Sequence, residues 1–177
     1  ATPKAVEGYL QDNAKYINPQ TLVIDFCGTK RRVCELGFAL AAEHGFTFVG
    51  GHPMAGNHNS GFKYARSNLY HNAPMVIVPA DFDDIALLGR VKDLLAPAGF
   101  GRLSVTTAEK HDEMIGFVSQ LTHCIAVSLM NCYDGEKLQD YTGDSFRDLT
   151  RIARINDEMW SELFLLNKDT LLEQMDK

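Results

Sequence analysis

The chain has 177 residues, of which 45% are hydrophobic, which is enough to bury a core in one large domain or in two small ones. The formal net charge of −6 at pH 7 argues against nucleic acid or an anionic membrane surface as the main partner, because the one basic cluster, residues 30–32, is too short to neutralise many phosphates. No uninterrupted apolar stretch approaches the roughly 20 residues of a membrane helix, and no signal peptide opens the chain, which predicts a cytoplasmic protein without a membrane partner.

The first hundred residues predict alternating helices and strands. We expect helices over residues 5–16, between Lys30 and Gly45, and over residues 62–70 and 83–96, and strands over residues 21–26, 46–49, 74–79 and 102–105. The first of these strands is almost continuously apolar, which is typical of a strand buried on both faces of a parallel sheet. Strand, helix and strand then make a βαβ unit, so the first two strands are expected to be parallel. Residues 50–61 are rich in glycine and predict a loop.

From Thr106 onward the sequence predicts helices only. Thr106 and Glu109 have the spacing of a capping box at the start of the first of them. The expected helices run from this cap to a stop at Asp134-Gly135, over residues 146–155, and from a cap at Asn156 toward the C-terminus. The predicted fold class is therefore α/β followed by all-α, with a parallel sheet in residues 1–105 and a helical domain in residues 106–177. Apolar helices that reach the end of the chain predict a second subunit, and we expect a homodimer through the helical domain.

His52 is the first titratable side chain of the glycine-rich segment. A histidine held at the end of a strand, with its backbone restricted by Pro53, suits general-base chemistry near pH 7. A histidine that merely caps the loop is an equal alternative. Parallel strands end at the same edge of a sheet, so Thr29, at the start of the following helix, is expected to share that edge with His52. The helix N-terminus there favours an anion or an oxygen-rich ligand, or Thr29 is simply the helix cap.

The helical part carries polar side chains with two possible readings. Ser119, Thr122 and His123 fall on neighbouring faces of one helix, and a histidine between apolar neighbours is more often a hydrogen-bonded core residue than a ligand-binding one. Residues 147–154 include three arginines. Such a charged run is usually a solvated face, although arginine is also the side chain best shaped to hold a carboxylate through two parallel hydrogen bonds.

Neither the cysteines nor the histidines predict a metal site. The four cysteines form no C-x-x-C pair and are expected to be reduced thiols; they are Cys27, Cys34, Cys124 and Cys132. A metal site built on His52, His58, His111 and Asp112 is disfavoured, because no pair shows the i, i+4 ligand spacing of a helix.

Four segments in sequence order resemble the prephenate dehydrogenase family of tyrosine biosynthesis, which includes the arogenate and cyclohexadienyl dehydrogenases. They are residues 23–30, residues 51–56 with 60–61, residues 119–123, and residues 146–153 with 159–160. The resemblance spans nearly the whole chain. Its most specific parts are the His-Pro-Met-Ala-Gly segment that begins at His52 and the Thr-Arg-Ile-Ala segment that contains Arg151.

The resemblance implies the oxidative decarboxylation of prephenate or arogenate, with hydride transfer to NAD or NADP and formation of an aromatic ring. It implies catalytic roles for His52, as acceptor of the hydroxyl proton, and for Thr29, where the family usually has serine. It implies substrate-binding roles for Arg151, His123 and Trp160, and cofactor-binding roles for Gly28, Thr29 and Lys30. No metal is implied.

The family begins with a strand, a G-x-G-x-x-G turn and a helix that hold the cofactor pyrophosphate, and this chain contains no such turn. By resemblance, residues 1–105 are the C-terminal portion of a Rossmann-like nucleotide-binding domain, and residues 106–177 are a helical substrate and dimerisation domain. We therefore expect a truncated form that is inactive alone. Two other hypotheses stay open: a non-catalytic dicarboxylate-binding or dimerisation module, and a metal hydrolase built on the histidines.

Overall fold

The computed structural model describes residues 2–56, 61–133 and 138–177. The chain forms two compact units, Ala1–Asp112 and Glu113–Lys177. The described strands all lie in the first unit and the second is built of helices, which confirms the predicted order of an α/β part followed by an all-α part. The expected loop position of His58 and the expected helix stop at Asp134-Gly135 lie outside the described residues.

Four strands form one sheet in the order β1-β2-β3-β4. They are β1 (Leu22–Ile24), β2 (Thr47–Pro53), β3 (Pro74–Val78) and β4 (Arg102–Val105). The β1–β2 and β3–β4 pairs are parallel, as a βαβ unit requires, but β2 and β3 are antiparallel. The sheet is therefore mixed, whereas the sequence predicted a parallel sheet. The reason is that the described residues between β2 and β3 form only the short 3₁₀ turn η2 (Phe62–Tyr64), which is no crossover helix.

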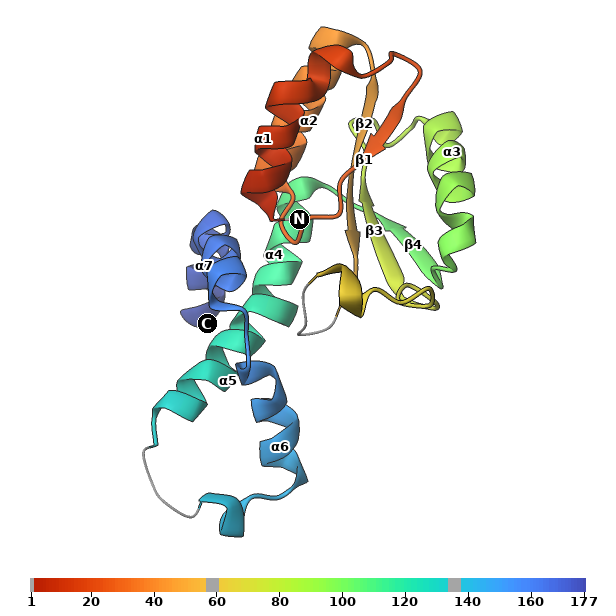
Figure 1. The fold of residues 1–177 in the computed structure, drawn as a ribbon. Coiled ribbons are helices and arrows are strands. Elements are labelled where there is room, and N and C mark those ends of the chain that lie inside the picture. The colour runs from red at the N-terminus through yellow and green to blue at the C-terminus, as the bar shows by residue number, and fades with distance from the viewer. Residues whose placement is uncertain (1, 57–60, 134–137) are drawn as a thin grey trace. The chain divides into compact units, whose positions relative to one another are not determined.

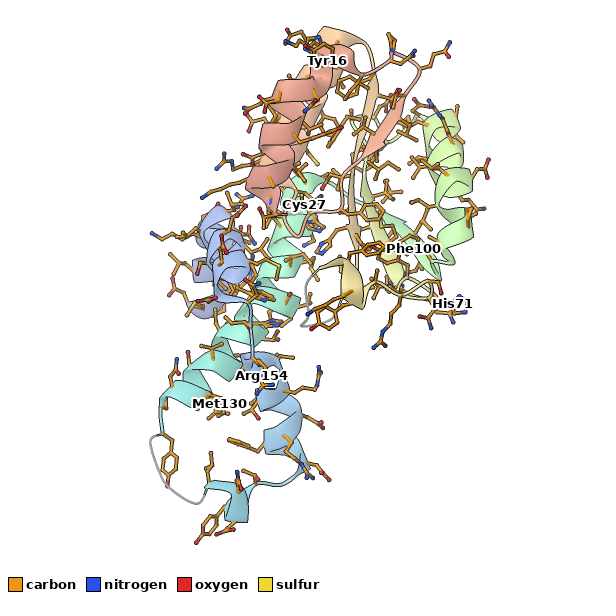
Figure 2. The ribbon with its side chains drawn as sticks, viewed as in Figure 1. Tyr16, Cys27, His71, Phe100, Met130 and Arg154 are labelled. Carbon is orange, nitrogen blue, oxygen red and sulfur yellow. The ribbon has the colours of Figure 1, made fainter. Side chains whose placement is uncertain are left out.

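Helices cover both faces of this sheet. Figure 1 shows α1 (Pro3–Asn13) and α2 (Arg31–His44) on one side and α3 (Ile85–Leu95) on the other. Gly45 ends α2 with a left-handed φ of 85°, and the Asp84 side chain caps α3 by accepting from the Leu87 backbone N–H at 2.8 Å. The 3₁₀ turns η1 (Ala14–Tyr16) and η3 (Ala96–Ala98) extend α1 and α3, and exposed Tyr16 closes the first of them (Figure 2).

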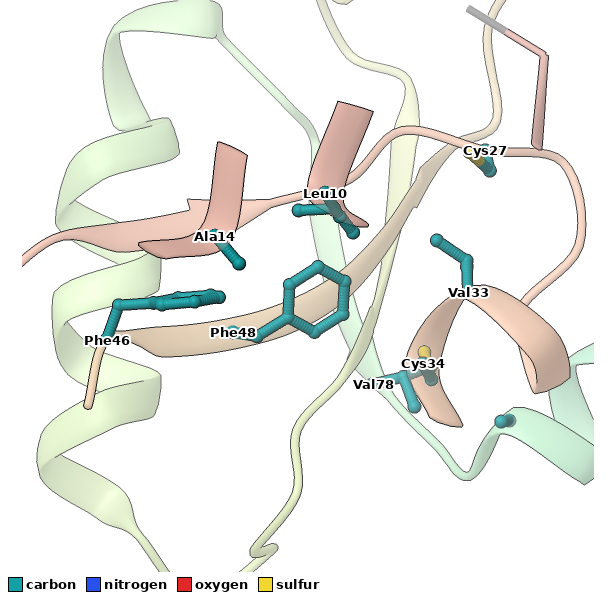
Figure 3. Packing of buried hydrophobic residues seen from close by; sticks show 9 residues of the cluster. Leu10, Ala14, Cys27, Val33, Cys34, Phe46, Phe48 and Val78 are labelled. Carbon is teal, nitrogen blue, oxygen red and sulfur yellow. The ribbon is translucent and has the colours of Figure 1, made fainter. Parts of the chain in front are cut away.

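The two faces of the sheet bury separate hydrophobic cores. On the α1–α2 side, Leu10 of α1 and Ala14 of η1 face the rings of Phe46 and Phe48 (Figure 3). On the α3 side, the buried residues are Val49, Met75, Ile77, Val91 and Leu95. Phe48 and Val49 are adjacent in β2 but belong to different cores, because successive side chains of a strand point to opposite faces. The apolar pattern of β2 and β3 therefore reflects burial on both faces, whereas β1, for which the sequence predicted such burial, lies at the edge of the sheet and its three residues are only partly buried.

His52 lies in a strand and not in a loop, which corrects the expected boundary of the glycine-rich segment. Strand β2 changes partners after Val49, so that Gly50, Gly51, His52 and Pro53 pair with β3. A side chain on Gly51 would have its Cβ 2.6 Å from the backbone oxygen of Asp25. This glycine therefore allows two backbone segments to pack closely, a role that local sequence does not distinguish from a turn.

The remaining elements are all helical, as predicted. They are α4 (Ala108–Ile115), the π-helix η4 (Gly116–Leu121), α5 (Thr122–Asn131), η5 (Leu138–Tyr141), α6 (Asp144–Thr150), η6 (Arg151–Ala153), α7 (Asp157–Leu166) and α8 (Lys168–Met175). Asn156 caps α7, confirming that prediction, with its side-chain oxygen 3.0 Å from the Met159 backbone nitrogen. The cap of α4 is Thr107, whose hydroxyl accepts from Lys110, and not Thr106. The Thr106 backbone N–H instead donates to Ile77 and prolongs the sheet.

One continuous helical stretch is more apolar than the sequence analysis indicated. Ala108–Asn131 is long and apolar enough to cross a membrane, by length and composition only. The helix contains no uninterrupted apolar run of about 20 residues, because polar residues interrupt its apolar ones. Such a helix is weak evidence for a membrane span, because core helices meet the same criterion. Buried Gln120 lies within it and donates to the Leu163 carbonyl while accepting from Asn167, so its amide is satisfied by neighbouring helices.

Candidate functional site

The segment after β1 is bound to the part of β2 that carries His52. The Asp25 carboxylate, buried immediately after β1, accepts from the backbone N–H groups of Cys27 at 2.8 Å and Gly51 at 3.1 Å. It also forms an ion pair with the ammonium group of Lys30. Because Gly51 is the neighbour of His52, these contacts fix the β1–α2 connection, seen at Cys27 in Figure 2, beside the histidine.

His52 belongs to a hydrogen-bonded series of three side chains. Its Nδ1 lies 2.8 Å from Nε2 of His111, and the two ring centroids are 5.0 Å apart. His111 in turn places its Nδ1 2.7 Å from Oδ1 of Asp112. His111 and Asp112 are both buried, near the start of α4, whereas His52 is partly exposed. The partly exposed imidazole is therefore supported from behind by a buried imidazole and a buried carboxylate.

Asp112 also occupies the N-terminus of α2. Its Oδ1 accepts from the Lys30 backbone N–H at 2.7 Å, and its Oδ2 accepts from the Arg31 backbone N–H at 3.0 Å and from Arg31 Nε at 3.3 Å. The free amide groups and the dipole of a helix N-terminus favour such an anion. The sequence predicted an anion at this helix end, and the anion that the structure places there is the chain's own carboxylate.

This environment keeps His52 uncharged at neutral pH. Burial lowers the pKa of His52 to about 3, and the nearby His111 and Lys30 act in the same direction, opposed by Asp112. Burial alone would raise the pKa of Asp112. Hydrogen bonds from His111 and from the Arg31 and Lys30 backbone outweigh that effect, so this pKa is lowered and Asp112 is ionised. The neutral imidazole of His52 has a lone pair that can accept a proton, and the ionised carboxylate is hydrogen-bonded to it only through His111.

The three residues predicted to bind the cofactor differ in the fraction of their surface that is exposed to solvent. Gly28 is half-buried, Thr29 is 5% exposed, and Lys30 is fully buried. The ammonium group of Lys30 is engaged by Asp25, so its side chain holds the segment together from within. Of the three, Gly28 therefore presents the largest share of its surface at the carboxyl end of β1.

In the second unit, two of the predicted substrate-binding residues contact each other. The rings of His123 on α5 and Trp160 on α7 stack with centroids 3.9 Å apart and an interplanar angle of 29°. His123 Nδ1 lies 2.8 Å from the Ser119 carbonyl oxygen, which can only accept, so this nitrogen carries a proton. The neutral ring would then expose an acceptor at Nε2. The stack fixes the plane of His123 without using that nitrogen.

Arg151 differs from Arg147, another arginine of residues 147–154, in whether its charge is paired. Arg147 forms an ion pair with Asp144 within α6, so its charge is already matched. Arg151 and Arg154 are exposed and form no ion pair within the described part of the chain; Arg154 is labelled in Figure 2. Arg151 lies in η6, which packs against α5.

The structure adds residues that the sequence reading did not assign. His111 and Asp112 were weighed only as metal ligands, and Gln120 and Asn167 were not considered as a pair. A signal was present for the first two, because an adjacent His-Asp pair falls in the first turns of a helix after a strand. Among the described residues no group of three or more His, Cys, Asp or Glu side chains is arranged to hold a metal ion.

Comparison with known families gives this geometry its context. A family model described as prephenate dehydrogenase, nucleotide-binding domain, matches residues 1–103. A second model, described as prephenate dehydrogenase, dimerization domain, matches residues 107–177. The chain belongs to the prephenate dehydrogenase family.

Members of the prephenate dehydrogenase family resemble the chain in sequence and in structure. The prephenate dehydrogenase of Bacillus subtilis (strain 168) is 33% identical over 168 residues, which are 91% of this chain and 44% of the relative. The crystal structure of prephenate dehydrogenase from A. aeolicus, in complex with hydroxyphenyl propionate and NAD+, matches with a TM-score of 0.83 at 28% identity, over 99% of this chain and 62% of that one. Synechocystis arogenate dehydrogenase matches with a TM-score of 0.78 at 26% identity, over 98% and 62% of the two chains.

Two facts about the chain follow. It spans 44% of the length of its Bacillus subtilis relative, as expected for part of a longer protein. Its first part matches a nucleotide-binding domain, which supports a nicotinamide-type cofactor, and its second matches a dimerization domain of the prephenate dehydrogenase family.

Proposed function

We propose that the protein containing this chain is an NAD(P)-dependent prephenate or arogenate dehydrogenase of tyrosine biosynthesis. It would convert a cyclohexadienol into a phenol by loss of hydride and carbon dioxide. The observation that carries the proposal is the uncharged, partly exposed imidazole of His52 at the end of β2, hydrogen-bonded through Nδ1 to His111. Family membership supplies the reaction class, and His52 supplies the proton acceptor that this reaction needs.

Each unit carries residues for which we propose a role toward the substrate. His52 accepts the proton of the ring hydroxyl, and buried Thr29 supports the nearby segment. Arg151, exposed and without an ion-pair partner in the described chain, binds a substrate carboxylate through two hydrogen bonds. His123 makes a second polar contact with the substrate, and Trp160 forms an apolar wall beside it, because their stacked rings offer one polar edge and one flat face.

The described residues fit a nicotinamide cofactor at one place. Gly28 lies at the carboxyl end of β1, where open α/β sheets bind their ligands. We assign Gly28 to direct contact and Thr29 and Lys30 to indirect roles, because Thr29 is 5% exposed and the Lys30 side chain is fully buried on Asp25. When bound, NAD or NADP would accept hydride from the ring carbon that bears the hydroxyl.

We further propose that residues 1–105 complete a nucleotide-binding domain with a segment outside this chain, that residues 106–177 bind substrate and form a cytoplasmic homodimer, and that this chain alone is inactive. The dimerization-domain match and the exposed apolar side chains Ile125, Leu129 and Leu165 support the second point.

Steady-state kinetics of the full-length protein test the proposal. Nicotinamide reduction should occur with prephenate or arogenate. His52→Asn should abolish turnover with a modest effect on substrate affinity, because it removes the proton acceptor, whereas Arg151→Ala should chiefly raise KM. Arg154→Ala is the matched control, since Arg154 is also exposed and lies in the same run. If neither prephenate nor arogenate supports nicotinamide reduction, the proposed reaction is wrong. If Arg151→Ala and Arg154→Ala raise KM equally, the substrate-binding role of Arg151 is wrong.

A further inference from the structure

His111 and Asp112 have a geometry that the proposed reaction does not by itself explain. Both are buried, yet they form a direct series with His52, through contacts of 2.8 Å and 2.7 Å. They come from the start of α4, whereas His52 comes from β2, so the fold brings together two segments that are 59 residues apart in sequence. A buried imidazole is costly unless its nitrogens are satisfied, and here both are.

The hydrogen bonds to Asp112 determine where the proton sits on His111. The carboxylate accepts from the backbone N–H of Lys30, the backbone N–H of Arg31 and the Nε–H of Arg31. An ionised carboxylate can only accept, so its contact with Nδ1 of His111 is an N–H that His111 donates. Neutral His111 then has its lone pair on Nε2.

The same logic extends to His52. Nε2 of neutral His111 is an acceptor, so Nδ1 of His52 must be the donor in their contact. Neutral His52 then has its lone pair on Nε2, which forms no hydrogen bond with any described residue. We propose that Asp112 and His111 are positioning residues that set the tautomer of His52, so that Nε2 is the nitrogen that accepts the substrate proton. This inference rests on the dehydrogenase function proposed above.

The series also provides a place for the positive charge. As the substrate O–H bond breaks, an N–H bond forms at Nε2 of His52. The proton on Nδ1 of His52 can then pass to Nε2 of His111, so that one N–H bond breaks and another forms. The charge ends on the imidazolium of His111, hydrogen-bonded to the Asp112 carboxylate, and His52 stays neutral. A bound nicotinamide would accept the hydride from the ring carbon, and the electron pair of the broken C–CO₂ bond would enter the ring to give a phenolate. The phenolate takes the proton back along the same series, which gives the phenol and restores neutral His111.

The cations beside the series are matched by carboxylates. Lys30 and Arg31 are the cations beside the series, and each has an anionic partner: Asp25 for Lys30, and Asp112 for Arg31. Asp112 therefore serves both the α2 N-terminus and His111. Its position couples the start of α2 to the orientation of the His52 ring, as outer groups orient catalytic or metal-bound histidines in other enzymes.

Nitrogen-15 NMR of histidine side chains in the full-length protein tests the tautomers independently of turnover. The His52 signal is assigned by its loss in His52→Asn. At neutral pH we expect protons on Nδ1 of both His52 and His111 and none on either Nε2. A proton on Nε2 of His52, or a charged His111 in the resting protein, would overturn the inference. If the spectra agree but no substrate is oxidised, the proposed function fails while the tautomer assignment holds.

Substitutions test the dependence on Asp112. Asp112→Asn places an amide N–H₂ among donors, and where it faces His111 it forces the opposite tautomers, so we expect the His52 proton to move at least partly to Nε2. We expect kcat to fall about 10–100-fold with little change in KM. His44→Gln, a distant histidine of the same unit, is the control and should leave kcat unchanged. An unchanged His52 spectrum in folded Asp112→Asn would refute the role of Asp112.

A second pair of variants covers the case in which Asp112→Asn does not fold. His111→Phe removes the acceptor for Nδ1 of His52, whereas His111→Gln keeps a side-chain oxygen able to accept that hydrogen bond. We expect His111→Gln to retain more of the Nδ1–H form of His52, and a higher kcat, than His111→Phe. Because glutamine cannot take up a proton, kcat should stay below that of the wild type. Equal spectra and equal kcat for the two variants would show that His111 only fills space.

Discussion

Replacing Lys30 by methionine removes the cation of a buried ion pair while roughly preserving the length of the side chain. The Lys30 side chain is fully buried and the Asp25 side chain is 1% exposed, so water cannot replace the lost partner. Asp25 retains two donors, the backbone N–H groups of Cys27 and Gly51. The variant therefore leaves a buried carboxylate that is hydrogen-bonded but not neutralised.

The expected cost follows from this environment. Removing one partner of a buried pair costs about 3–5 kcal/mol, and the two remaining N–H donors place Lys30→Met near the lower end. A loss of about 3 kcal/mol is a large share of a stability that is typically about 5–15 kcal/mol. Asp25→Asn should cost a similar amount, because it leaves the ammonium unpaired. The double variant has no unpaired charge and should lose clearly less than the sum of the two.

Urea unfolding of the full-length protein, followed by circular dichroism, measures these free energies from the midpoint and the slope. Lys92→Met, at an exposed position of α3, is the matched control and should change stability by no more than about 0.5 kcal/mol. The reasoning is refuted if Lys30→Met behaves like Lys92→Met, or if the effects of Lys30→Met and Asp25→Asn are additive.

Two further predictions concern stability. The pKa of His52 is about 3 in the folded protein and about 6.5 when unfolded, so the unfolded state binds the proton first as the pH falls. The stability that neutral His52 contributes is complete above pH 6.5 and is lost as the pH falls toward 3, with a loss of about 2 kcal/mol at pH 5. In urea unfolding, His52→Gln should therefore lose less stability than the wild type between pH 7 and pH 5. Equal losses in the two proteins would contradict this. Gly51→Ala should destabilise by about 1–3 kcal/mol or more, because its Cβ would meet the Asp25 backbone oxygen at 2.6 Å, whereas Gly89→Ala, with open space in α3, should stabilise by up to about 1 kcal/mol. Thermal unfolding of both variants checks this contrast, and equal melting temperatures would show that Gly51 is not needed for close packing.

Local sequence alone was sufficient for several elements of this protein. The stop of α2 at Gly45 and the cap of α7 at Asn156 depend on residues within one or two turns, so their residue types predict them. His52 was singled out by its chemistry and its place after a strand, and the resemblance to a family assigned it a role.

Tertiary structure decided the features that join distant segments. Gly50 and Gly51 have the composition of a turn but continue β2, because glycine is required by the close approach of Cys34 to Gly50 and of Asp25 to Gly51 and not by the local backbone. Asp112 binds the backbone of Lys30 across 82 residues, and His111 meets His52 across 59. Helical and strand periodicity encode which face of an element is buried, but not which polar group the closed chain places against it. The partners of His52 could therefore be identified only from the folded structure.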